Sequence, residues 1–318
     1  MTSPLLALPG AVPADAPDQD VAAHYGDPFR EQRRLESGVG AVDLSHRPVL
    51  RITGPDRLTW LHSLTSQHLE ALPPGVASEA LILSPTGHVE HALYLVDDGA
   101  TTWVHIEPGT AGTLVGWLDS MRFWSKVEIE DASTSYAVVW QPVTEPSDAH
   151  VSRVVTASDG VLAGRDLFVP REQLVAFVRE PAGIWAYEAL RIAAGQPRLG
   201  FETDHRTIPH EVNWIGRAVH MDKGCYRGQE TVARVHNLGR PPRRLVMLHL
   251  DGSDSQLPAH GDAVELDGRA VGFVTSAARH HELGPVALAL VKRSTPEDAE
   301  LTAGGIAASQ QSLTRAEL

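Results

Sequence analysis

The sequence predicts an α+β protein that ends in a small antiparallel β-barrel, and three regions support this prediction. Residues 78–107 are predicted to form a three-stranded meander, with a helix over 108–121 after it. Residues 184–194 have a helical pattern, and Gly195 is a natural C-cap. Beyond Arg243, short strand-forming runs alternate with turn residues, which is typical of a closed barrel.

The order of strands and helices follows from local signals. Turn residues divide the meander at Pro85-Thr86-Gly87 and again at Asp97-Asp98-Gly99. A strand over 48–53 precedes it, and Gly54-Pro55-Asp56 then opens a helix, because proline suits the first helical position and aspartate the positive end of the helix dipole. A further helix is expected to start near Gly228. The barrel strands are expected at 245–250, 263–266, 269–276, 286–291 and 305–309.

Composition limits the classes of function. The chain has 318 residues, with 27 Lys and Arg against 40 Asp and Glu, so its formal net charge is −13. A field of that sign disfavours direct nucleic-acid binding. One cysteine excludes an intrachain disulfide and fits a reducing cytoplasm. No apolar run reaches the roughly 18 residues of a membrane span. Residues 1–18 contain four prolines and are expected to form a disordered arm.

The densest chemical signal is the run Lys223-Gly224-Cys225-Tyr226-Arg227-Gly228-Gln229-Glu230. Two cations and a helix N-terminus beside a thiol favour the thiolate, so Lys223 and Arg227 are predicted to lower the pKa of Cys225. The alternative is a buried structural cysteine, which is the commoner fate of a lone one. A single thiolate cannot hold an iron–sulfur cluster, so other ligands would come from a partner. The same thiol could instead sense oxidants as a sulfenic acid.

Other polar clusters give weaker signals. The basic run from Arg234 to Arg244 lacks the interleaved aromatic residues that stack on bases, so it is either a contact for an anionic ligand or partner, or a solvated linker. His62, His68, His88 and His91 do not have the spacing of a zinc motif, and no metal site is predicted.

The motif Lys-Gly-Cys-Tyr-x-Gly-Gln-Glu at 223–230 resembles the signature of the YgfZ family, relatives of the glycine-cleavage T-protein and of mitochondrial iron–sulfur assembly factors. Gly195–Gly200, Ile208–Glu211 and Arg243-Arg244-Leu245 fit the same pattern, and Asp43-Leu44-Ser45-His46 resembles the start of a T-protein folate domain. The resemblance implies a ring of two ferredoxin-like lobes and a terminal barrel around a central hole that binds tetrahydrofolate. The folate-binding domain would span residues 19–240 and the barrel domain 241–318.

Two departures from the aminomethyltransferase pattern affect the expected chemistry. The paired aspartates of that branch, one of them catalytic, are replaced by His91 and Ala92, so catalysis is left open. The glutamate that reads the pterin edge is replaced by Ala193, and Glu211 is the expected substitute, because a carboxylate suits a guanidine-like edge. The other expected contacts are Glu188 to the pterin edge, Trp214 for stacking, and Arg234, with Arg217 and Arg227, to the folate tail.

Three hypotheses about function follow. The first is a tetrahydrofolate-binding accessory protein for iron–sulfur enzymes or cluster carriers, including a tRNA methylthiolase, with Cys225 as the working thiolate. The second is a tetrahydrofolate-dependent aminomethyl or one-carbon transferase, for which the missing aspartates are unfavourable. The third is an adaptor for tRNA modification, for which the net charge of −13 is unfavourable.

Overall fold

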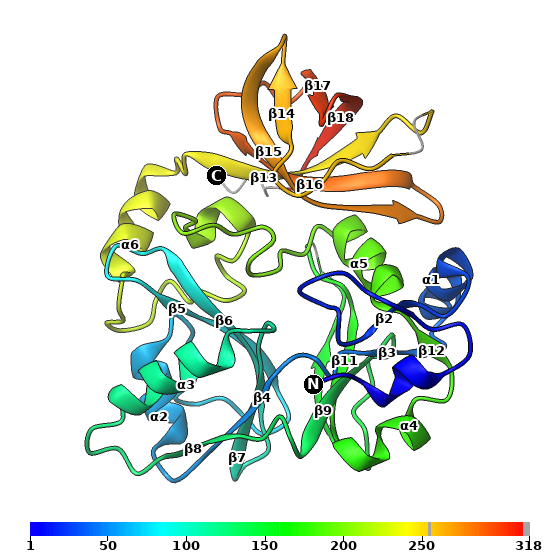
Figure 1. Cartoon of the computed structure of the whole chain (residues 1–318). Helices are drawn as coiled ribbons and strands as arrows, with labels where there is room; N and C mark the ends of the chain where they lie inside the picture. The colour runs from blue at the N-terminus through cyan, green and yellow to red at the C-terminus, as the bar shows by residue number, and fades with distance from the viewer. Residues whose placement is uncertain (159, 254–255, 314–318) are drawn as a thin grey trace.

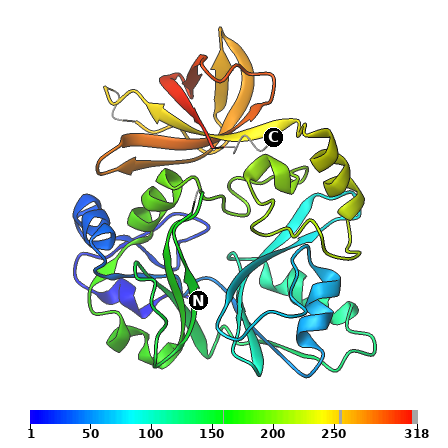
Figure 2. The ribbon, with the colours of Figure 1, turned by 180° about the vertical axis from the view of Figure 1, so that it is seen from behind.

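The computed structural model describes residues 1–158, 160–253 and 256–313. Two α+β lobes lie side by side, and a β-barrel lies across both of them (Figure 1). The view from behind shows the same three parts around a common centre (Figure 2). The predicted fold class is confirmed, and the centre between the lobes becomes the natural place to look for a site.

The first lobe is a five-stranded antiparallel sheet in the order β5-β6-β7-β4-β8. Its core lies between the sheet and two helices, with Ile52, Leu61 and Leu114 all fully buried. The meander predicted over 78–107 is therefore present, and the helix predicted over 108–121 runs from 111 to 120. The elements are β4 Val49–Thr53, α2 Arg57–Leu64, β5 Ala77–Leu83, β6 Val89–Asp97, β7 Thr101–His105, α3 Ala111–Ser120 and β8 Glu128–Asp131.

The second lobe is a five-stranded sheet in the order β10-β11-β9-β3-β12, in which only β12 and β3 pair in parallel. The helix α5 packs Ala186 and Leu190 into its core, and Gly195 follows that helix with a φ of +71°. The elements are α1 Pro28–Glu36, β3 Ala41–Asp43, β9 Tyr136–Gln141, β10 Val151–Val155, β11 Gly164–Pro170, η2 Arg171–Gln173, α4 Leu174–Phe177, β12 Pro181–Ala182 and α5 Ile184–Ala193.

The N-terminal segment is ordered, so the prediction of a disordered arm over residues 1–18 is wrong. It forms η1 Pro4–Ala7 and β1 Val12–Pro13, which pairs with β2 Ala22–His24. Leu5 is fully buried in the second lobe, and the Asp18 carboxylate is bound by Arg198. The prediction of disorder rested on proline content alone. The burial of Leu5 and the ion pair of Asp18 with Arg198 instead hold the segment against the rest of the chain.

The barrel closes in the order β13-β16-β15-β14-β17-β18, and closure leaves no unpaired strand edge. Inward side chains such as Val246, Leu248 and Val274 fill it. The sequence predicted five of the six strands; the missed one is the four-residue β17. The elements are β13 Arg243–Leu250, β14 Ala263–Leu266, β15 Arg269–His280, β16 Gly284–Lys292, β17 Glu300–Ala303 and β18 Ile306–Ser312.

The chain between α5 and the barrel is mostly loop, with η3 Pro209–Val212 and α6 Gln229–Leu238. The predicted helix start is confirmed: Gly228 is the N-cap of α6, in a left-handed conformation with φ +83°. No helix among the described residues is long and apolar enough to cross a membrane.

Candidate functional site

The thiol segment, residues 223–230, lies against the turn between β5 and β6. Cys225 is exposed, which does not fit the buried structural alternative. A Cβ at Gly228 would lie 2.5 Å from the Ser84 carbonyl oxygen and 2.9 Å from the Gly87 Cα atom, so only glycine permits this approach. The close contact presents the thiol to solvent just ahead of the α6 N-terminus.

Both cations of the thiol segment have partners in the first lobe. The Lys223 Nζ donates to the carbonyl oxygens of Thr65 (2.6 Å), Gln67 (3.2 Å) and His62. Burial lowers the pKa of this ammonium to about 8. Arg227 forms an ion pair with Glu90 at 2.9 Å. These contacts make both residues anchors of the segment, while their effect on the thiol of Cys225 stays a prediction.

Glu211 and Trp214, predicted to read and stack on a pterin, are buried away from solvent. Glu211 is 1% exposed, and its two carboxylate oxygens accept from Nε and Nη2 of Arg243, each at 2.8 Å. This bidentate pair raises the pKa of Arg243 and joins η3 to the first barrel strand. Trp214 is fully buried in an apolar core between the first lobe and the barrel. Both side chains contribute to packing of the barrel on the lobes.

Glu188 and Arg234 lie elsewhere. Glu188 accepts from Arg191 at 2.7 Å and is 3.4 Å from Arg198, whereas Arg234 is exposed on α6. Among the described residues, no hydrogen bond or ion pair joins any two of Glu188, Glu211, Trp214 and Arg234. Glu188 borders the buried charges around Arg198, whereas Glu211 and Trp214 lie where the barrel packs on the first lobe. Their contacts with folate stay a prediction.

The positions of the missing aspartates lie on β6. Ala92 is 3% exposed and packs in the same apolar core as Trp214. His91 is partly buried, and this burial lowers its pKa. Neither side chain offers a carboxylate to align an amine substrate.

A buried network of charges fills the seam between the lobes. Arg198 lies at its centre: its Nε donates to Glu107 at 2.7 Å and its Nη2 to Asp18 at 2.6 Å. His46 contacts the same Asp18 oxygen at 2.8 Å. Burial alone would raise the pKa of Asp18, but the hydrogen bonds from Arg198 and His46 hold it well below its usual range. The network ties the N-terminal segment to both lobes.

Two cavities border this network. The larger one has a volume of about 520 Å³, and its lining includes Gln19, His46, Arg47, Asp131 and Arg171. The smaller one has about 20 Å³, and its lining includes Glu79, Arg153, Asp166, Tyr187 and Gln196. Arg47 lies between them, because it lines the larger cavity and its guanidinium is 5.6 Å from the Tyr187 ring centre. We call the two cavities and the network between them the interlobe tract.

Several buried polar atoms of the interlobe tract have no hydrogen-bond partner within the described chain. They are Ser45 Oγ, His46 Nδ1 and Arg47 Nε, whereas Glu107 Oε1 and Glu79 Oε2 form ion pairs with Arg47 (3.6 Å) and Arg217 (2.8 Å). Buried polar atoms are nearly always hydrogen-bonded, so this concentration indicates that water or a bound molecule completes the set. One sequence feature pointed to this region, because Ser45 and His46 belong to the four residues 43–46 that resemble the start of a folate domain.

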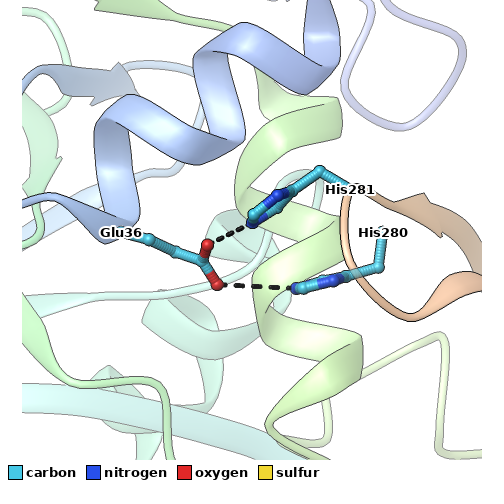
Figure 3. A group of neighbouring side chains, drawn as sticks. All are labelled: Glu36, His280 and His281. Atoms are coloured by element: carbon cyan, nitrogen blue, oxygen red, sulfur yellow. Dashed lines mark hydrogen bonds and ion pairs between the residues drawn. The ribbon is translucent and has the colours of Figure 1, made fainter.

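A different titratable group joins the second lobe to the barrel (Figure 3). Glu36, at the end of α1, faces His280 and His281 at the turn between β15 and β16. The His281 Nε2 hydrogen-bonds one carboxylate oxygen, and the His280 Nε2 is 3.7 Å from the other. The His280 Nδ1 accepts from the backbone amides of Glu282 and Leu283, each at 3.2 Å, so its proton is on the Nε2 that faces Glu36. This group is a polar clamp between the two units.

Comparisons with known proteins agree with this architecture. Residues 243–310 match the family model of the glycine cleavage T-protein C-terminal barrel domain. The crystal structure of the glycine cleavage system aminomethyltransferase T from Bartonella henselae superposes with a TM-score of 0.79 at 18% identity, over 94% of this chain and 92% of that one. The chain therefore has a T-protein-like aminomethyltransferase fold with the C-terminal barrel of that superfamily.

Curated relatives are transferases by name. An aminomethyltransferase of Nostoc sp. is 27% identical over 82% of this chain and 79% of its own length, and one of Streptomyces coelicolor is 26% identical over 89% and 86%. A putative chloroplastic transferase of Arabidopsis thaliana is 26% identical over 76% of this chain. The match spans 62% of that relative's length.

Proposed function

We propose that this protein binds tetrahydrofolate in the interlobe tract and, as a member of the YgfZ branch, supports iron–sulfur enzymes through Cys225. The folate proposal rests on three consecutive residues, Ser45 to Arg47, which line a cavity of about 520 Å³ and each have a buried polar atom without a hydrogen-bond partner in the described chain. That volume lies within the roughly 300–1,000 Å³ typical of small-molecule sites. The aminomethyltransferase names of the curated relatives support the same substrate class.

The lining of the larger cavity fits the chemistry of folate. Arg47 and Arg171 supply guanidinium groups for the carboxylates of the glutamate tail. Asp131 supplies a carboxylate for the hydrogen-bond donors on the pterin edge. The smaller cavity has similar polar groups, but its 20 Å³ has room for about one water. We therefore assign the ligand to the larger cavity.

Gln19 allows a direct test of this assignment. It is exposed at the wall of the larger cavity, so replacing it leaves the buried network intact. Calorimetric titration of tetrahydrofolate under reducing conditions should show binding to the wild type and to Gln19→Ala, and binding at least about tenfold weaker to Gln19→Trp, whose indole enters the cavity. Equal binding to all three proteins would place folate elsewhere, and no binding to the wild type would refute the folate proposal.

Glu211→Ala is not a suitable probe of folate binding. It would break the buried Glu211–Arg243 pair and leave Arg243 with Asp204 as its carboxylate partner, so a loss of binding could not be separated from a loss of stability.

The iron–sulfur part of the proposal needs its own experiment. The exposed Cys225 can meet a partner that supplies the remaining cluster ligands, which one thiolate cannot provide. In a strain lacking the native protein, Cys225→Ser should fail to restore iron–sulfur enzyme activity, while Gly224→Ala, next to it and open to solvent, should restore it. Full restoration by Cys225→Ser would refute the role of the thiol and leave folate binding untouched.

Aminomethyl or one-carbon transfer is the second candidate, favoured by the names of the curated relatives. His91 and Ala92 provide no carboxylate on β6. We therefore expect no turnover of methylenetetrahydrofolate with a small amine substrate. Measurable turnover would make this candidate the better one.

A further inference from the structure

Three titratable side chains of the first lobe converge near the thiol segment. His62 lies near the end of α2, and His68 and Glu70 lie in the loop that follows; each offers a ligand atom, and these atoms lie within 4.8 Å of one another. The ring centre of His220, from the long loop before the thiol segment, is 5.4 Å from that of His68. We infer that His62, His68 and Glu70, with His220 as a fourth ligand, form a binding site for a divalent metal ion of the zinc class.

The donor set agrees with this metal. Zinc in proteins prefers four ligands drawn from imidazole, thiolate and carboxylate groups, and three histidines with one glutamate meet that preference. Ions such as Mg²⁺ and Ca²⁺ prefer oxygen ligands, so they fit less well. The sequence did not reveal the group, because its members stand at 62, 68, 70 and 220 and have no motif spacing.

The segments that carry these ligands are held together by hydrogen bonds. The His220 amide donates to the Ser66 carbonyl at 2.9 Å. The Gln67 side chain donates to the Arg217 carbonyl at 2.7 Å, and Lys223 binds the carbonyl oxygens of residues 62, 65 and 67. The ligands therefore start from a fixed backbone, which lowers the entropic cost of binding a metal.

The hydrogen bonding and exposure of the group also suit metal binding. The His62 side chain is partly buried near the end of α2. Its Nδ1 accepts a long 3.3 Å hydrogen bond from the Leu69 amide, and coordination would give up only that bond. His68, Glu70 and His220 are exposed and free to turn towards an ion.

The polar clamp of Figure 3 is the competing location for a metal. There, the Nδ1 of His280 accepts from two amides, and its Nε2 carries the proton towards Glu36. A metal bound at Nε2 would displace that proton to Nδ1, where it would disrupt the hydrogen bonds from both amides. The clamp is therefore the poorer site.

Zinc titration of the full chain, without an affinity tag and in a non-chelating buffer, tests the inference. Calorimetry should show one Zn²⁺ bound per chain, and His68→Ala or His220→Ala should weaken binding at least about tenfold, since even residues that only orient ligands cost that much. His205→Ala, a matched change at another exposed histidine, and His281→Ala at the clamp should bind like the wild type.

Three results would overturn the inference: no zinc binding to the wild type, unchanged binding to His68→Ala, or loss of binding in His281→Ala. A pH series adds an independent readout, because affinity should fall below about pH 6, where imidazoles take up protons. The site involves neither the folate cavity nor the thiol, so its failure would leave the proposed function standing.

Discussion

The thiol segment and the interlobe tract are built in opposite ways. In the thiol segment, Cys225 is exposed and the ion pair of Arg227 with Glu90 is open to solvent, with side chains 33% and 38% exposed. In the tract, Arg198 is 1% exposed and binds two buried carboxylates. The strongest sequence motif is therefore open to solvent, whereas the tract is held by buried ion pairs and borders a cavity.

The largest expected effect tests whether the buried ion pairs of the interlobe tract stabilise the fold. Arg198→Met should lower the free energy of unfolding by roughly 3–5 kcal/mol, because it removes the buried guanidinium that binds both Asp18 and Glu107. Chemical denaturation measures the change. Arg51→Met, which breaks an exposed pair with Glu130, is the control and should cost less than about 1 kcal/mol. Similar losses in both variants would mean that the tract is not a special source of stability.

The second largest expected effect is a loss of stability in acid, caused by His210 at the junction between η3 and α6. Burial, with a smaller contribution from His236, lowers the pKa of His210 to about 4. The unfolded chain takes up the proton near pH 6.5 and the folded one only near pH 4, so stability is full above pH 6.5 and falls between pH 6.5 and 4. We expect His210 to account for about 2 kcal/mol of this loss.

Unfolding curves at pH 7 and pH 4.5 measure this loss, and His210→Phe should reduce it. Because the ring nitrogens of His210 have no partner in the described chain, phenylalanine removes no hydrogen bond. If the variant loses as much stability between pH 7 and pH 4.5 as the wild type, other groups, such as the carboxylates of the tract, are responsible.

The smallest expected effect tests whether Cys225 in the thiol segment is exposed. Cys225→Ala should change the free energy of unfolding by less than about 0.5 kcal/mol, as is usual for an exposed side chain. The thiol of the native wild type should react fully with a disulfide reagent without denaturant. A thiol that reacts only after unfolding would contradict the exposed position and with it the proposed contact with a partner.

Local sequence signals predicted much of the fold. Alternating apolar residues and paired turns gave the meander, and the glycines at 195 and 228 marked the end of α5 and the start of α6. The barrel strands followed from the same pattern, apart from the short β17. These features depend on neighbours in the chain, which the sequence contains directly.

The candidate site was predicted less well. The thiol segment was found from its motif, but Glu211 was expected to read a pterin and instead binds Arg243. Proline content suggested a disordered arm, yet Asp18 of that arm contacts Arg198, 180 positions away. The sequence alone does not distinguish a carboxylate that binds a ligand from one that pairs with an arginine far away in the chain.

By itself, therefore, the sequence determined the elements, the closing barrel and the position of the lone thiol, because backbone propensity and turn chemistry act over a few residues. Only the tertiary structure decided which charges neutralise one another, where a cavity remains between the lobes, and which histidines meet. Those outcomes depend on burial and on contacts between residues far apart in the chain, where a low dielectric makes each unpaired charge or polar atom costly.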